Sequence, residues 1–149
     1  MNLVLLIGRH LKSGEVIDLL ERWEAEVVYD FDRLHEGTPD GYHSSLPEAG
    51  LELVFDASQV LTTVFVHLQS DGDFSSFDLK GSDIEPFDSV EAVRQFATSE
   101  DLVPNQGSSS FDGVERDWIR LEWSTHSVHY EFIEDRLHLV TITMRQAVT

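Results

Sequence analysis

The chain contains no cysteine, only four prolines and only ten basic residues among its 149 positions. Without cysteine it has neither a disulfide framework nor thiol chemistry, which is compatible with a reducing compartment. Its apolar runs are short, since none approaches the roughly 18 residues that a membrane span requires. The run from Leu3 to Ile7 is too short for a signal peptide and follows no basic residue, so we expect a cytoplasmic protein that does not enter a membrane.

The scarcity of basic residues leaves a large excess of negative charge. There are 28 acidic residues, and the formal net charge at pH 7 is -18. Such a chain repels phosphate backbones, and nucleic-acid binding depends on Lys and Arg, so we expect no nucleic-acid partner. The same field attracts basic proteins and can speed their association by about 10- to 1,000-fold, although acidity that serves only solubility would give the same composition.

Apolar and aromatic residues are nevertheless abundant enough for a core. Hydrophobic residues make up 41% of the chain, with nine Phe, three Trp and three Tyr, whereas a disordered acidic chain would have few of these. A chain of this length forms one domain and buries about 68–70% of the surface that it exposes when unfolded. We therefore predict a single domain over residues 1–149 that uses no cofactor.

Two segments have the spacing of amphipathic helices. Apolar residues three and four positions apart, from Val16 to Trp23, predict a helix over residues 13–25 with Ser13 as its N-cap. The same spacing after Ser89 predicts a second helix that ends near position 99.

Segments rich in β-branched and aromatic residues predict the strands. A hairpin is predicted over residues 51–55 and 60–67, after a short candidate strand at 27–31, and an antiparallel meander over 118–123, 128–133 and 137–144. Turn-forming residues dominate 26–49 and 101–110, so we expect irregular chain there. The pattern predicts an α+β fold in which an antiparallel sheet carries two main helices.

The two halves of the chain, residues 1–70 and 71–149, have similar patterns. Ser13-Gly14-Glu15-Val16 precedes Ser89-Val90-Glu91-Ala92 by 76 residues, and Phe55 precedes Phe132 by 77 residues in the predicted hairpins. Each half runs from a helix through a long loop to strands. The pattern fits either an internal duplication or two generic α+β units.

The acidic segment that precedes the second helix is the candidate binding site. It combines carboxylates with interspersed phenylalanines, and apolar anchors within a negative field suit the capture of a basic protein surface. A solvated loop whose phenylalanines enter the core would have the same composition. The residues that we predict to bind a partner are Asp71, Asp73, Phe74, Phe77, Asp78, Asp83, Glu85 and Asp88.

Two stretches resemble small bacterial immunity proteins of polymorphic toxin systems. Residues 6–20, with Leu6-Ile7-Gly8-Arg9-His10-Leu11-Lys12-Ser13-Gly14, resemble their opening turn and first short helix. Residues 50–66, with Leu51-Glu52-Leu53-Val54-Phe55 and Leu61-Thr62-Thr63-Val64-Phe65-Val66, are similar to the hairpin that follows there. The resemblance implies a protein that neutralises a toxin domain by binding it, and it assigns no contact residue. Acidity, size and the resemblance together lead us to expect that it docks on a bacterial effector such as a basic nuclease and blocks its active site or substrate path.

Two other classes of function stay open at this level. A small-ligand protein or an enzyme would use a cleft between sheet and helices, with His129, Glu131 and His138 as polar groups. The seven histidines have no metal-ligand spacing, because even His126 and His129 straddle a predicted turn, so we predict no metal site and no enzyme. A subunit that self-associates through an exposed sheet edge is the third alternative.

Overall fold

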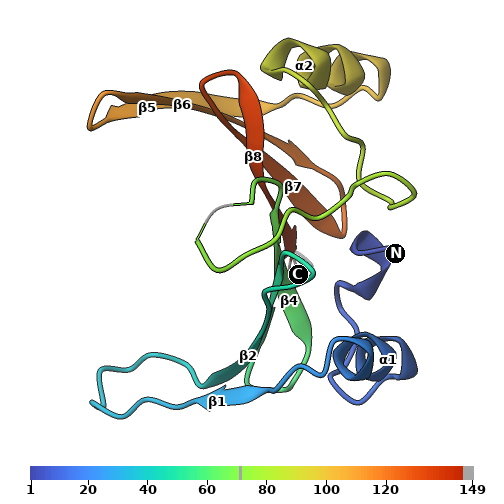
Figure 1. The fold of residues 1–149 in the computed structure, drawn as a ribbon, viewed down its shortest axis with the longest axis vertical. Helices are drawn as coiled ribbons and strands as arrows, with labels where there is room; N and C mark the ends of the chain where they lie inside the picture. The colour runs from blue at the N-terminus through green and yellow to red at the C-terminus, as the bar shows by residue number, and fades with distance from the viewer. Residues whose placement is uncertain (71, 146–149) are drawn as a thin grey trace.

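The structure is a computed structural model that describes residues 1–70 and 72–145. Its central feature is one eight-stranded sheet with the strand order β1-β2-β3-β4-β8-β7-β6-β5, in which all neighbouring strands are antiparallel. The two halves of the chain meet where β4 pairs with β8. Figure 1 shows both α-helices and the N-terminal turn on one side of this sheet. The predicted α+β class, an antiparallel sheet with two main helices, is confirmed.

The elements follow one another in the same order in both halves. In the first half, the 3-10 turn η1 (Val4–Leu6) and helix α1 (Gly14–Arg22) precede strands β1 (Val28–Asp30), β2 (Gly41–Leu46), β3 (Leu51–Phe55) and β4 (Leu61–His67). In the second half, helix α2 (Val90–Ser99) precedes β5 (Asn105–Phe111), β6 (Val114–Glu122), β7 (His126–Ile133) and β8 (Arg136–Met144). Each half is therefore one α-helix followed by a four-stranded meander.

The similarity of the halves extends to an irregularity in strand pairing. The register skips Thr62 where β3 pairs with β4, and it skips His138 where β7 pairs with β8. Each extra residue is a β-bulge that leaves a leucine opposite a phenylalanine, Phe55 or Phe132. Both phenylalanines are 1% exposed, so the two bulges flank equivalent core positions 77 residues apart.

The core lies between the sheet and the helices. Residues at alternating positions of β3, β4, β6, β7 and β8 are buried against Val16, Leu19 and Leu20 of α1 and against Val93 and Ala97 of α2. Helix α1 is shorter than the predicted 13–25, because the chain turns into positive φ at Glu24 directly after the C-cap. Helix α2 has the predicted bounds, and its N-cap Ser89 accepts a hydrogen bond from the Ala92 N–H.

Two segments predicted to be irregular are in fact strands. Residues 41–46 form β2 and residues 105–111 form β5. Both are rich in serine and glycine, so their composition hides a strand that main-chain pairing with the neighbouring strand creates. The glycine in β5 is required for packing, because a Cβ at Gly107 would lie 2.8 Å from three atoms of the Trp118 indole.

Candidate functional site

The acidic segment, residues 69–88, of which the structure describes all but position 71, lies between β4 and α2 (Figure 1) and is attached to the body of the protein at several points. Near its start, the Ser75 N–H donates to a carbonyl in the β2–β3 turn, and the Phe77 N–H donates to the His67 carbonyl, each at 2.8 Å. Further on, Leu79 and Ile84 are buried in the core. The predicted contact residues from Asp73 to Asp88 therefore lie on a segment that is held against the body of the protein.

Most of the predicted carboxylates of this segment face solvent. Asp73, Asp78, Glu85 and Asp88 are exposed, whereas Asp71 lies outside the described residues. The Asp78 carboxylate accepts the main-chain N–H two positions along the chain at 3.0 Å, which closes a local turn and leaves the charge at the surface. These carboxylates therefore contribute to the negative electrostatic field that would attract a basic protein.

Asp83 has a different role from the other carboxylates. Its two oxygens accept the main-chain N–H groups of Val4 and Leu5 at 3.0 and 3.1 Å. These are the first N–H groups of η1, which have no acceptor within the turn itself. Asp83 therefore ties the N-terminal turn to the acidic segment.

The phenylalanines of the acidic segment pack against the body of the protein. Phe74 stacks on His67, with ring centroids 4.0 Å apart, and Phe77 packs partly buried against the core. Phe87 lies 5.2 Å from the Phe96 ring and 5.3 Å from the Tyr130 ring. All three rings are half-buried, so they attach the segment to the fold and offer a partner less apolar surface than their number suggests.

Apolar side chains are more exposed in residues 27–43, which comprise β1, the loop after it and the start of β2. We call this segment the β1–β2 arm. Figure 1 shows it projecting from the sheet on the side away from the helices. Tyr29 and Tyr42 are paired across β1 and β2, and Tyr42 is paired with the core residue Phe55. The aromatic row thus continues the core face of the sheet to its edge. Beyond it, Phe31 is 51% and Leu34 is 75% exposed.

Carboxylates surround these apolar side chains and also shape the loop that holds them. Asp32 accepts the Glu36 and Gly37 N–H groups, both at 2.9 Å, and these bonds lower its pKa. Asp40 accepts the Tyr29 hydroxyl at 2.7 Å, and this bond raises the pKa of the tyrosine. The arm therefore combines aromatic rings with carboxylates, and it also carries a cation, because the Arg33 guanidinium lies 5.1 Å from the centroid of the Phe31 ring.

The arm was not among the predicted contact residues, although its sequence carried a signal. The candidate strand at 27–31 contains Val28, Tyr29 and Phe31, with Asp30 between the last two. These three side chains have more apolar surface than a three-residue edge strand can bury. Because β2 was not predicted, nothing in the sequence indicated that this strand would lie at the sheet edge. The exposure of its side chains became visible only with the topology.

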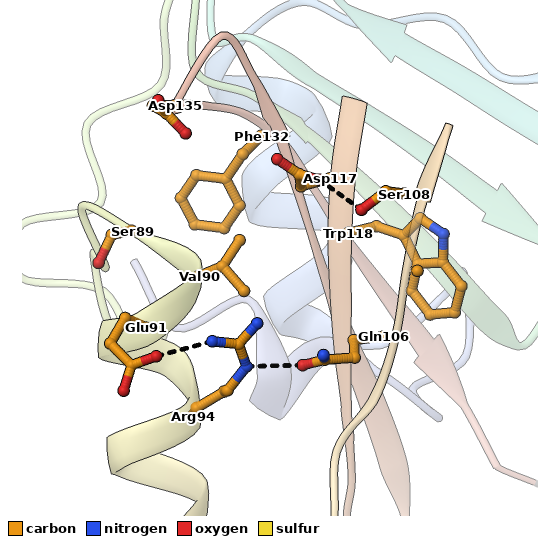
Figure 2. A pocket seen from close by; sticks show the side chains of 11 residues that line it. Ser89, Val90, Glu91, Arg94, Gln106, Ser108, Asp117, Trp118, Phe132 and Asp135 are labelled. Atoms are coloured by element: carbon orange, nitrogen blue, oxygen red, sulfur yellow. Dashed lines mark hydrogen bonds and ion pairs between the residues drawn. The ribbon is translucent and has the colours of Figure 1, made fainter. Parts of the chain in front are cut away.

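A hollow of about 370 Å³ opens between the start of α2 and strands β5 and β6 (Figure 2). Its polar side chains are hydrogen-bonded to one another: Arg94 donates to Glu91 of the same helix at 2.7 Å and, across the gap, to Gln106 at 2.8 Å. On the facing wall, the Ser108 hydroxyl donates to Asp117 at 2.6 Å. The Arg94–Gln106 bond connects α2 to β5, which gives the hollow a structural role.

Two of the residues proposed for a ligand cleft, His129 and Glu131, do not face the helices. His129 and Glu131 alternate along β7 with buried residues, so they lie on the opposite face of the sheet. Glu131 accepts a hydrogen bond from Arg116 at 3.0 Å, and His129 lies 5.2 Å from the Trp118 ring. Burial lowers the pKa of His129, and Glu131 partly opposes this shift. His138 is the bulge residue of β8.

The comparisons with known proteins add no relative. Neither family models, nor curated proteins, nor solved structures match this chain. Within residues 1–70 and 72–145, no three His, Asp or Glu side chains are grouped so that they could hold a metal ion. In the same part of the chain, neither helix is long and apolar enough to cross a membrane.

Proposed function

We propose that this chain is an immunity-type protein, which binds a basic toxin domain of bacterial origin and neutralises it by covering its active site or substrate path. The observation that carries the proposal is the β1–β2 arm, where Phe31 and Leu34 are exposed among the carboxylates Asp30, Asp32 and Asp40. Aromatic and aliphatic anchors enclosed by polar groups are typical of the energetic centre of a protein interface.

Charge supports a basic partner. The net charge of -18 gives a field that draws in a positively charged surface and speeds encounter. The exposed carboxylates of the acidic segment, including Asp73 and Asp78, add to this field at a distance from the arm. The resemblance of residues 6–20 and 50–66 to immunity proteins supports a toxin as the partner.

Two pairs of exposed apolar residues allow a matched test. The arm variant is Phe31→Ser with Leu34→Ser, and the control is Leu5→Ser with Ile17→Ser, which removes two exposed apolar side chains from η1 and α1. The tagged proteins are used to capture partners from the source bacterium at low salt. A partner that copurifies at one-to-one stoichiometry is then produced alone, and its toxicity and enzymatic activity are measured with and without each variant.

We expect the arm variant to weaken binding by about 10-fold or more, because two interface anchors together contribute more than about 1.4 kcal/mol. The control should bind and inhibit as the wild type does. Asp73→Lys with Asp78→Lys should slow association at low salt and have little effect at high salt. A captured partner that the arm variant binds and inhibits normally would contradict the arm as the binding site, and a partner that is not inhibited would contradict the immunity role.

A further inference from the structure

Strand β5 forms one edge of the sheet and is open on its outer side. It pairs with β6 over seven residues, from Asn105 to Phe111, and among the described strands it has no other neighbour. Its sequence, Asn-Gln-Gly-Ser-Ser-Ser-Phe, contains no charged residue and no proline. Natural proteins protect edge strands with charges, prolines or short length, and β5 has none of these protections.

The other edge of the sheet differs in each respect. Strand β1 has three residues, and one of them is Asp30. Its Asp30 carboxylate is paired with His43 of β2. In a chain with a net charge of -18, an uncharged edge of seven residues is an exception that calls for an explanation.

Exposed apolar side chains lie near both ends of β5. Val103 is 91% exposed and Phe111 is 75% exposed, and among the described residues of this half they are the most exposed large hydrophobic ones. They are eight positions apart in the sequence, with Gly107 midway between them. Because side chains alternate along a strand, positions 103, 107 and 111 share one face if the extended chain continues through Pro104.

We propose that β5 pairs with β5 of a second copy of this chain, antiparallel and around a two-fold axis at Gly107. In this register Val103 of each copy lies opposite Phe111 of the other, so both exposed apolar residues are covered at both ends. Between them, Asn105 faces Ser109 and Gln106 faces Ser108, which gives polar pairs without charge. The interface is isologous, as two-fold dimers require.

A second copy fits this edge better than a charged partner does. Two chains with a net charge of -18 repel each other, so a contact between them is least unfavourable where the contact itself carries no charge. The glycine at the axis also suits close approach. The Trp118 indole already covers the main chain of Gly107, so the two indoles would lie on one face of the continuous sheet, on either side of the axis.

The dependence on salt distinguishes this dimer from binding to a basic partner. Screening shortens the range of repulsion from about 30 Å at 0.01 M salt to about 8 Å at 0.15 M. The dimer should therefore become tighter as salt is added. Binding of a basic protein to the acidic surface should become weaker under the same change.

The test is sedimentation equilibrium of the purified chain over a wide range of protein concentrations, at about 0.01 M and about 0.15 M salt. We expect a monomer–dimer equilibrium that shifts towards dimer with concentration and with salt. Ser109→Glu adds a charge within the proposed interface and should weaken the dimer by about 10-fold or more, which corresponds to about 1.4 kcal/mol. Ser58→Glu adds the same charge at an exposed turn of the other half and should leave the equilibrium unchanged.

The register can be tested separately because the chain has no cysteine. A double variant, Val103→Cys with Phe111→Cys, should form an interchain disulfide between these two positions under mild oxidation, and peptide mapping would identify it. Circular dichroism verifies that each variant is folded. A wild-type monomer under all conditions, a dimer that Ser109→Glu does not weaken, or a dimer without the 103–111 cross-link would overturn the proposal.

Discussion

Replacing Asp83 with alanine should loosen the N-terminal turn from the rest of the protein. The substitution removes the acceptor for the Val4 and Leu5 N–H groups, which lie 3.0 and 3.1 Å from the carboxylate oxygens. The turn also packs Leu3 and Leu6 into the core. An acidic cap replaced by alanine costs about 0.5–2 kcal/mol, and two bonds to one exposed carboxylate place this site at about 1–2 kcal/mol.

For a domain of this size, that loss corresponds to a decrease in Tm of about 2–8 °C. Thermal and urea unfolding followed by circular dichroism at neutral pH would measure it. Asp83→Asn keeps one acceptor oxygen and should lose less stability than Asp83→Ala. The control is Asp73→Ala, a change at an exposed carboxylate of the same segment that should alter the free energy of unfolding by less than about 0.5 kcal/mol.

The same variant has a second, independent readout. Burial lowers the pKa of His126, and the negative charge of Asp83 partly opposes that shift. Asp83→Ala should therefore lower the pKa of His126 further, as an NMR titration of the imidazole would show. Unchanged stability together with an unchanged His126 titration would refute the structural role that we assign to Asp83.

Three further changes test the fold directly. Phe132→Ala should reduce the free energy of unfolding by about 3–5 kcal/mol in urea titrations, because the ring is fully buried. Gly50→Ala should destabilise by more than about 1 kcal/mol in the same assay, because the new Cβ would lie 2.3 Å from the Ser75 carbonyl oxygen at a φ of +76°. His129 should titrate below its ordinary pKa in NMR spectra, and Glu131→Gln should lower that pKa further.

The sign of the last effect also predicts a pH dependence of stability. The folded pKa of His129 is lowered, so between that value and the unfolded pKa near 6.5 the unfolded chain binds more protons. The stabilising contribution of the neutral His129 side chain to the free energy of unfolding is therefore present above about pH 6.5 and is lost as the pH falls below that value. A His129 that titrates above its ordinary pKa, or a neutral Phe132→Ala or Gly50→Ala variant, would contradict the packing described here.

The sequence was sufficient to predict the fold class and most of the elements, because side-chain periodicity reports burial. Both α-helices, the strands of the central hairpins and the meander had alternating or helical apolar patterns, and all are present. Strands β2 and β5 were not predicted, because they form by main-chain pairing with neighbouring strands. Their own residues do not have the apolar pattern of a strand. Gly107 illustrates the difficulty: a residue typical of loops is needed in β5 to accommodate Trp118.

The candidate site was less predictable than the fold. Composition correctly indicated a negative surface, but it could not tell which phenylalanines would be exposed. Phe74 and Phe77 pack against the body, whereas Phe31 lies in the open because the aromatic row extends past the helices. Exposure depends on which element covers which part of the sheet, and that information exists only in the topology.

The central claim, that the β1–β2 arm binds and neutralises a basic effector domain, is tested most directly by one inhibition measurement. The captured effector is titrated with the wild-type chain, with the Phe31→Ser and Leu34→Ser double variant, and with the Leu5→Ser and Ile17→Ser control. The account predicts stoichiometric inhibition by the wild type and the control, and a concentration for half-inhibition that is about 10-fold or more higher for the arm variant. Equal inhibition by all three proteins would contradict it.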